Sequence, residues 1–562
     1  MITLDTHGAR GFRAHFPYDP DTVDRIKLCM GFRWEPTGKY WYAEGPESLI
    51  DLERYEMDYR LTSAAHERAT SFHNRFESIL ELKLRKYDDG EMFAYQKDGA
   101  DALYFQEKGI LADDVGLGKT KQALDACGML HEEGRAKMVL FLTHKTLIYN
   151  VVDEILTWHP DFDVHVVNPP GKLPVTYTVT KTPPAEGFQT KDGKMLVVVT
   201  SYERALMYRG FHFTQPWDVV IFDEAQRIKN HKTETHKMVS KLVAGAPFAF
   251  ALTATPLELR VEELYSIFSV LRPSVFGSWT RFSRDHIKEV TDNWGHVIAR
   301  QVRNTTLLKE RIGPWVFRRT REDVLKQLPG AMPPVYIYPE MTAGESKLYD
   351  GLVSDRSMIE IERMLRLQQF TSSPRLLGYS ELGAKFDELV QLLDGWDGVT
   401  LVFTRFKKML DILMEELNLP AEACMYGQLT DAGERHRRVK AFNNGELGRV
   451  FISTDAGAHG LNFNAVDMIV HYDKLWNPAK EHQREGRALG LRQLGKDKPL
   501  SVAYLLDVDT IDVGMQQVTD ERQRLFNDLI TDADETMIAK FRPSDFEKIA
   551  RGQYTSAGEN KE

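Results

Sequence analysis

The chain has 562 residues, of which 42% are hydrophobic and 27% are charged. This length exceeds the roughly 250–300 residues that one hydrophobic core can organise, so a small binding module is excluded and two large domains with smaller units are predicted. The three cysteines form no CxxC pair, which excludes a disulfide framework and a cysteine zinc site and fits a reducing compartment.

Charge and the N-terminus limit the partners and the location. Lys and Arg number 72 against 82 Asp and Glu, a net charge of −10, so binding to nucleic acid requires a local basic track. The N-terminus has no apolar signal core, and no run approaches the ~18 apolar residues that cross a bilayer. We expect a cytoplasmic protein with no membrane partner, located with the nucleoid if the source is bacterial and in the host cytoplasm if it is viral.

Residues 1–60 are predicted to form a small α+β domain rich in aromatic side chains. We expect a helix near 21–30, followed by a hairpin that turns at Thr37 and Gly38. Residues 61–89 are polar with apolar residues at helical spacing, which predicts a connecting helix.

Two series of short apolar runs follow, with helical stretches between the runs. In residues 90–275 the runs are GILA at 109–112, MVLFLT at 138–143, MLVVVT at 195–200, DVVIFD at 218–223 and AFALT at 249–253. In residues 381–542 they are VTLVFT at 399–404, RVFIST at 449–454, DMIVHY at 467–472 and SVAYLLD at 501–507. Such runs predict parallel strands buried on both faces, so we expect two doubly wound α/β lobes. Residues 276–380 are predicted to form a helical, basic inter-lobe region, and residues 543–562 a flexible tail.

The first run leads into a glycine-rich turn and then a helix. The turn reads Asp113-Asp114-Val115-Gly116-Leu117-Gly118-Lys119-Thr120. Such a turn presents backbone N–H groups to phosphates, while its lysine neutralises the β and γ oxygens and its threonine hydroxyl can ligate Mg²⁺. The strict pattern has glycine where Asp113 stands, so an ordinary strand-to-helix turn is the alternative.

A pair of carboxylates, Asp223 and Glu224, follows the run DVVIFD. The carboxyl end of a buried parallel strand is where ligands bind in such folds. There Asp223 could hold the Mg²⁺ shell and Glu224 could orient and deprotonate the attacking water. An acidic pair that only caps a helix is the alternative, and the phosphate loop about a hundred residues upstream argues against it.

A longer series of sequence motifs resembles, in its order and its residues, the Swi/Snf-type ATPases of helicase superfamily two, which are double-stranded DNA translocases. The blocks are YQKDGA, LADDVGLGKTKQAL, THKTLIYN, VVTSYE, DEAQRIKN, ALTATPLELRVEELYSIFSVLRPSVFGS, FRRTREDVLKQLP, TLVFTRF, FISTDAGAHGLNFNAVDMIVHYDKLWNP and HQREGRALGLRQ. The resemblance runs from about residue 90 to 530, and RRTREDVLKQLP distinguishes this branch from strand-separating relatives. It implies two tandem RecA-like doubly wound lobes with helical insertions, which use ATP and Mg²⁺.

The resemblance assigns roles to single residues. The catalytic residues would be Lys119, Asp223, Glu224 and Arg487, the last as an arginine finger in cis. The ATP-binding residues would be Gln96, Asp114, Gly116, Gly118, Lys119, Thr120, Lys121, Gly460, Arg484 and Arg487. Mg²⁺ would be held by Thr120 and Asp223, while Thr253 and Thr255 would connect the nucleotide site to DNA. The DNA-binding residues would be Lys145, Thr146, Ser201, Arg227, Lys229, Thr404 and Arg405.

The last block departs from the family pattern QRxGRxxRxGQ. Gly490 stands where the pattern has its second arginine, and Arg492 follows two positions later. On a helix, a shift of two residues turns a side chain by about 200°, so we assign the finger to Arg487 and leave the role of Arg492 open. Reduced ATPase activity is the expectation.

Residues 16–52 are similar to the small substrate-recognition domain that precedes the motor in annealing helicases, the enzymes that rewind or remodel forked DNA. The similarity lies in a helix followed by a hairpin with spaced tryptophans, Trp34 and Trp41. Exposed aromatic residues, Arg33 or Lys39 at this hairpin could contact DNA. The alternative is that the large side chains are only the core of a tiny domain.

The leading hypothesis is an ATP-driven double-stranded DNA translocase that remodels or reanneals branched or forked DNA. We expect it to be a monomer, with double-stranded or branched DNA and other replication or repair proteins as partners. The first alternative is a strand-separating helicase or a motor subunit of a restriction or phage DNA-processing system. The second is a degenerate motor that acts as a DNA-binding scaffold, which Gly490 favours and the presence of all four catalytic residues disfavours.

Overall fold

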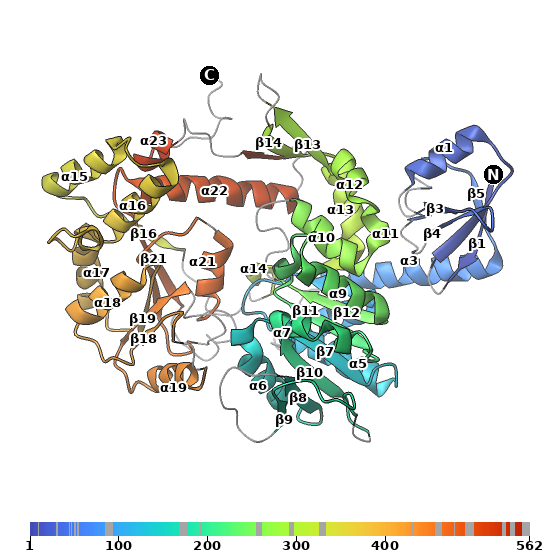
Figure 1. The fold of residues 1–562 in the computed structure, drawn as a ribbon, viewed down its shortest axis with the longest axis horizontal. Helices are drawn as coiled ribbons and strands as arrows, with labels where there is room; N and C mark the ends of the chain where they lie inside the picture. Colours follow the sequence, from blue (N-terminus) through green and yellow to red (C-terminus); the bar gives the residue numbers. More distant parts are fainter. Residues whose placement is uncertain are drawn as a thin grey trace.

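The chain folds into a small N-terminal domain and two larger lobes (Figure 1). The computed structural model describes residues 1–8, 11–29, 32–43, 45, 48–49, 52, 55–84, 94–167, 177–190, 193–253, 261–291, 297–324, 333–429, 432–455, 463–476, 478–488, 499–530, 536–539 and 546–553. None of the described helices is long and apolar enough to cross a membrane.

The N-terminal domain pairs its described strands in the order β3-β4-β2-β1-β5. Its elements are β1 (Ile2–His7), β2 (Gly11–His15), α1 (Pro20–Leu28), β3 (Phe32–Glu35), β4 (Tyr40–Ala43) and β5 (Tyr59–Leu61). Asp19 begins α1, because its carboxylate accepts a hydrogen bond from Thr22 N at 2.9 Å. Helix α3 (Ser63–Leu84) leads to the first lobe, so the predicted helix, hairpin and connecting helix are confirmed.

Lobe 1 contains a parallel sheet in the order β15-β6-β12-β11-β7-β10-β8-β9. Its strands are β6 (Lys108–Leu111), β7 (Met138–Thr143), β8 (Asp163–Val167), β9 (Thr178–Thr180), β10 (Leu196–Ser201), β11 (Val219–Asp223), β12 (Phe248–Leu252) and β15 (Val316–Phe317). Its helices are α4 (Ala94–Gln106), α5 (Lys119–Glu132), η1 (Lys145–Leu147), α6 (Ile148–Trp158), α7 (Tyr202–Met207), α8 (Arg209–His212), η2 (Ala225–Ile228), α9 (Glu234–Gly245), α10 (Val261–Leu271), α11 (Pro273–Phe276) and α12 (Trp279–His286). All five runs predicted for this lobe are strands.

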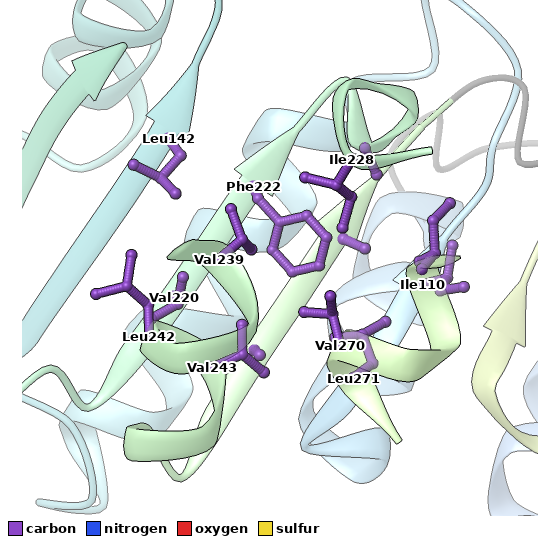
Figure 2. Close-up of a cluster of buried hydrophobic side chains, with 14 of the residues drawn as sticks. Ile110, Leu142, Val220, Phe222, Ile228, Val239, Leu242, Val243, Val270 and Leu271 are labelled. Carbon is purple, nitrogen blue, oxygen red and sulfur yellow. The ribbon is translucent and has the colours of Figure 1, made fainter. Parts of the chain in front are cut away.

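Both faces of this sheet are buried. Along β11, Val220 and Phe222 pack into a cluster on one face, and Val219 and Ile221 into a cluster on the other. Figure 2 shows the first cluster, where side chains of β11 meet those of α9 and α10. This two-sided burial fixes the position of Asp223 at the end of β11.

Lobe 2 has a second parallel sheet, in the order β16-β21-β20-β17-β19-β18. Its strands are β16 (Val335–Ile337), β17 (Thr400–Thr404), β18 (Cys424–Met425), β19 (Val450–Thr454), β20 (Met468–His471) and β21 (Ser501–Leu505). Its helices are α15 (Ala343–Ser354), α16 (Glu360–Ser372), η4 (Pro374–Leu377), α17 (Ala384–Asp394), α18 (Lys407–Glu416), α19 (Ala432–Asn443), α21 (Pro478–Glu485), α22 (Ile511–Ile530) and α23 (Phe546–Ala550). The four predicted runs are strands, and the α/β fold class with two doubly wound lobes is confirmed.

The predicted helical region between the lobes is wrong in part. It contains α13 (Thr305–Ile312), η3 (Gly313–Trp315) and α14 (Arg321–Val324), but also β13 (Ile287–Thr291) and β14 (Val297–Val302), which form a small antiparallel sheet with β22 (Thr536–Ala539). It also supplies the edge strands β15 and β16 to the two lobe sheets. The strands were missed because they are short and their basic residues resemble a solvated helix face.

The predicted flexible tail is also wrong in part. Within it, Phe546, Ile549 and Ala550 of α23 are buried in a cluster with residues of α15, α16 and α22. Residues 554–562 lie outside the described part of the chain.

Candidate active site

The glycine-rich turn lies between β6 and α5, at the carboxyl edge of the lobe 1 sheet. Gly116 and Gly118 have φ values of +86° and +76°, a region that other residues rarely adopt, so the turn requires glycine at both positions. The first intrahelical bond of α5 runs from Gln122 N to the Gly118 carbonyl at 3.1 Å, so the preceding amides are directed out of the helix end. The turn therefore has the backbone of a phosphate-binding loop.

Lys119 lies over this turn. Its ammonium donates to the carbonyl oxygens of Asp113 at 2.7 Å and Asp114 at 3.0 Å. Burial lowers the pKa of Lys119, while the nearby carboxylates of Asp113, Glu224 and Asp223 oppose that shift. The lysine charge is thus held between the turn and the acidic pair.

Two other predicted ATP ligands differ in their surroundings. Gln96 is buried beside the turn, where its amide donates to the Leu117 carbonyl at 3.4 Å and its Oε1 has no hydrogen-bond partner among the described residues. Lys121 instead pairs with Asp125 at 2.7 Å, and its Nζ lies 5.2 Å from the centre of the Trp158 ring. Within the described chain, Gln96 thus has an unpaired amide oxygen beside the turn, whereas the Lys121 ammonium is already paired with a carboxylate.

Asp223 and Glu224 lie together where β11 ends. The Asp223 carboxylate accepts hydrogen bonds from Glu224 N at 2.9 Å and from the Thr143 hydroxyl at 3.1 Å. Burial and the neighbouring Glu224 carboxylate raise the pKa of Asp223 to about 7, against the pull of Lys119. Glu224 has a φ of +51°, which is uncommon for a residue with a side chain and is typical of functional sites. A buried acidic pair of this kind suits a cation.

A chain of hydrogen bonds leads from Glu224 to the following strand. Gln226 donates to Glu224 Oε2 at 2.6 Å, and the hydroxyl of Thr253 donates to Gln226 Oε1 at 3.2 Å. These bonds join Thr253 to the predicted catalytic carboxylate through Gln226, which sequence reasoning did not single out. The link from Thr253 to DNA stays a prediction. Thr255 lies outside the described residues.

Arg319 explains why aspartate stands at position 113. Its guanidinium and backbone N–H bond the Asp113 carboxylate, with Arg319 N to Asp113 Oδ1 at 3.0 Å, and it also donates to Gln122 Oε1 at 2.8 Å. Arg319 is 4% exposed and Asp113 is fully buried. Pairing of β15 with β6 brings the two residues together, so Arg319 supports the phosphate-binding loop. The block FRRTREDV marked this arginine in the sequence, but its partner was not identifiable there.

Lobe 2 meets the phosphate-binding loop through the turn that follows α21. A Cβ built on Gly486 would lie 2.0 Å from Cγ1 of Val115, so only glycine allows this approach. Arg487 is the next residue. Burial lowers its pKa, and the carboxylates of Glu224 and Asp223 in lobe 1 oppose that shift. The predicted finger thus lies beside the point where lobe 2 contacts lobe 1, near enough to the predicted catalytic carboxylates for their charges to act on it.

Arg484, three residues earlier, is used inside lobe 2. Its guanidinium is buried, forms an ion pair with Asp455, and donates to the Asp473 carbonyl at 3.3 Å. The predicted assignment of Arg484 to ATP therefore receives no support from its contacts, whereas Arg487 lies near the lobe 1 carboxylates. Helix α21 ends at Glu485. Gly460, Gly490 and Arg492 lie outside the described residues.

The predicted DNA contacts fall into two groups. Ser201 and Thr404 are buried: Ser201 caps α7 by accepting from Arg204 N at 3.2 Å, and the Thr404 hydroxyl donates to Asp473 Oδ2 at 2.6 Å. Neither side chain has exposed surface for a phosphate, which argues against direct contact with DNA. The Thr146 side chain lies outside the described residues.

Four basic residues form the other group, which we call the basic track: Lys145, Arg227, Lys229 and Arg405. Lys145 is exposed, and Arg227 forms an exposed ion pair with Glu203 at 3.0 Å. Lys229 is exposed and pairs at 3.7 Å with Glu263, which is buried. Arg405 is half-buried and donates to Gln368 Oε1. An exposed ion pair contributes only about 0–1 kcal/mol, so Arg227 can exchange its carboxylate for a phosphate.

The chain matches two protein families. The model described as "SNF2-related domain" matches residues 68–382, and the model described as "Helicase conserved C-terminal domain" matches residues 384–490. An uncharacterised ATP-dependent helicase of Mycoplasma pneumoniae is 28% identical over 474 residues, which are 80% of this chain and 43% of that protein. The chromodomain-helicase-DNA-binding protein 1-like of Mus musculus is 27% identical over 455 residues, 75% of this chain and 48% of that protein. The chain spans about half the length, or less, of these curated relatives.

A solved structure is also similar, the Sulfolobus solfataricus SWI2/SNF2 ATPase core in complex with dsDNA. It shares 23% sequence identity, covers 80% of this chain and 95% of its own, and superposes with a TM-score of 0.38. The fold assignment above rests on the two parallel sheets themselves.

Proposed function

The chain belongs to the SNF2-related family, and from that premise we propose that it is an ATP-driven translocase on double-stranded DNA. The observation that carries the proposal is the contact of Gly486 of lobe 2 with Val115 of the phosphate-binding loop, because it brings the next residue, Arg487, close enough to Asp223 and Glu224 of lobe 1 for their charges to act on it. An arginine there stabilises charge that develops on the γ-phosphate. ATP hydrolysis then depends on how closely the lobes approach, and this dependence can convert hydrolysis into movement.

ATP occupies the phosphate-binding loop in this proposal. The amides at the start of α5 and the Lys119 ammonium hold the phosphates, and the Gln96 amide meets the adenine edge. The donor set suits Mg²⁺, because the Asp223 carboxylate and the Thr120 hydroxyl are oxygen ligands. When bound, Mg²⁺ neutralises phosphate charge. Glu224 takes the proton of the attacking water.

DNA lies along the basic track in this proposal. Contacts from Lys145, Arg227, Lys229 and Arg405 to phosphates position the duplex without reading its bases, which suits movement along any sequence. The hydrogen bonds from Glu224 through Gln226 to Thr253 give DNA binding a route to the catalytic carboxylate.

Steady-state ATPase activity tests the proposal when it is measured without DNA and with single strands, blunt linear duplex or a model fork. We expect strong stimulation by duplex and fork and weak stimulation by single strands. Stimulation by single strands alone would favour a strand-separating helicase instead. No stimulation by any DNA would favour a degenerate motor that acts as a DNA-binding scaffold.

We further propose that the substrate is branched or forked DNA, selected by the N-terminal domain. The domain is joined to lobe 1 by α3 and by a hydrogen bond from Arg281 Nη1 to the Cys29 carbonyl at 3.1 Å, so it holds a defined place beside the motor. Deletion of residues 1–60 should preserve stimulation by blunt duplex and reduce activity on forks. Equal activity on forks would reduce the domain to a structural cap.

A further inference from the structure

A groove of about 740 Å³ lies at one edge of the N-terminal domain. It runs between α1 and the β3–β4 hairpin, and its lining includes Tyr18, Trp34, Trp41 and two lysines. Figure 1 shows the domain beyond lobe 1, joined to it by α3. The groove is thus separate from the ATP site and from the basic track.

Tyr18 and Trp34 of the groove do not belong to the domain core, whereas Phe16 and Trp41 are partly buried and pack against it. That core is closed by fully buried side chains, including Leu4, Phe12 and Ile26. By contrast, Tyr18 is 84% exposed and Trp34 is 47% exposed. The rings of Trp34 and Trp41 have centroids 5.6 Å apart and are tilted by 54°, so they do not cover each other face to face. Large aromatic surfaces exposed together in this way mark an interaction site.

The charges of the groove have one sign. Lys27 and Lys39 belong to its lining, and none of the described residues that line it is acidic. Lys27 pairs with Asp24 at 3.0 Å, but both side chains are more than half exposed, so the pair is weak and exchangeable. Lys39 has a φ of +53°, an unfavourable region for a lysine, so this backbone is held in a conformation that glycine would adopt at lower cost.

We propose that this groove binds a single-stranded DNA segment, with its bases stacked on Trp34 and Tyr18 and its phosphates beside Lys27 and Lys39. Aromatic platforms with cations along a groove are how proteins hold unpaired nucleotides. A duplex cannot use these platforms, because its bases are already stacked and paired. A peptide rich in proline also fits aromatic grooves but gives no role to two lysines. This inference rests on the proposed function, since an unpaired strand beside a duplex motor is what a fork presents.

Photo-crosslinking tests the proposal in the full chain without ATP. The probe is a 12-nucleotide oligothymidylate that carries one 5-iodouracil, and the crosslinked residues are mapped by mass spectrometry. We expect crosslinks at Trp34, Tyr18 or Trp41, and competition by unlabelled oligothymidylate but not by blunt duplex or a proline-rich peptide. Crosslinks confined to the lobes, or competition by the peptide, would overturn the proposal.

Two single variants sharpen the test. Trp34→Ala and Lys39→Ala should each lower the crosslinking yield in the groove about 5- to 100-fold, the range expected from the loss of one stacked base or one phosphate contact. Tyr338→Ala is the matched control, because Tyr338 is 51% exposed and lies outside the domain. Unchanged yield in both groove variants would overturn the proposal.

Stimulation of ATPase activity by blunt duplex is measured in parallel. It should be the same in the groove variants and in the parent chain. If duplex stimulates none of them, the proposed motor function fails, while the crosslinking result still decides the groove.

Discussion

The two lobes contribute to the candidate active site in different ways. Lobe 1 holds its charges in place by bonds of its own, since Asp113 is bonded to Arg319 and Asp223 to Thr143. Lobe 2 contributes Arg487, whose nearby opposite charges lie across the boundary in lobe 1. In the proposed function, the lobe 1 half is therefore preorganised for ATP, whereas the lobe 2 half contributes only when the lobes approach each other.

Two arginines of lobe 2 differ in the same way. Arg484 bonds Asp455 and the Asp473 carbonyl within its own lobe, while Arg487 lies near the Asp223 and Glu224 carboxylates of the other lobe. In the proposed function, Arg484 supports lobe 2 and Arg487 acts in catalysis. The variants below each change a residue on one side of the boundary between the lobes.

Lys119→Ala removes the point charge at the phosphate-binding loop and should have the largest effect on the lobe 1 half. We expect ATP hydrolysis to fall on the order of 10³-fold, the loss typical of a charge aimed at the transition state, with DNA binding preserved. Lys121→Ala is the matched control and should change turnover little, because its side chain pairs with Asp125. Unchanged turnover in Lys119→Ala would refute the site.

Arg319→Ala should destabilise lobe 1, because it leaves the Asp113 carboxylate buried without its cation. Breaking a buried pair in this way costs about 3–5 kcal/mol. Thermal melting checks this, and the double variant Arg319→Met with Asp113→Asn should recover most of the loss. An unchanged melting temperature in Arg319→Ala would show that the loop does not depend on this pair.

The stability of lobe 1 should also fall in acid, because burial lowers the pKa of His212 from 6.5 to about 4. Between these values the folded chain binds fewer protons than the unfolded chain, so this effect is absent above pH 6.5 and stability is lost as the pH falls toward 4. At pH 5 the loss is about 2 kcal/mol. The drop in melting temperature between pH 7 and pH 5 should be smaller in His212→Leu. An equal drop in the variant would assign the acid sensitivity to other groups.

Gly486→Ala should keep the lobes apart, because its Cβ would overlap Val115. We expect turnover to fall about tenfold, a loss of about 1.4 kcal/mol in the transition state, with the melting temperature unchanged. The double variant Gly486→Ala with Val115→Ala should regain part of the activity. If the double variant were no more active than Gly486→Ala, the contact between the lobes would not limit turnover.

Much of the lobe 1 half was predictable from the sequence because its parts are local. The glycine-rich turn before Lys119 and the pair Asp223 and Glu224 are each a short stretch of sequence, and each directly follows a buried strand whose apolar run shows where the strand ends. The contact between Arg319 and Asp113 was not predictable, because the two residues are 206 positions apart in the sequence. Only the pairing of the two-residue strand β15 with β6 brings them together. The sequence also did not show that α21 ends at Glu485, two residues before Arg487.

The most direct test of the account is the turnover of Arg487→Ala at saturating ATP and saturating duplex DNA. The account predicts a fall of about 10³-fold, the effect of losing an arginine finger, with ATP affinity, duplex affinity and melting temperature close to those of the parent chain. Duplex-stimulated turnover close to that of the parent chain would contradict it, because hydrolysis would then not depend on the residue that lobe 2 brings to lobe 1.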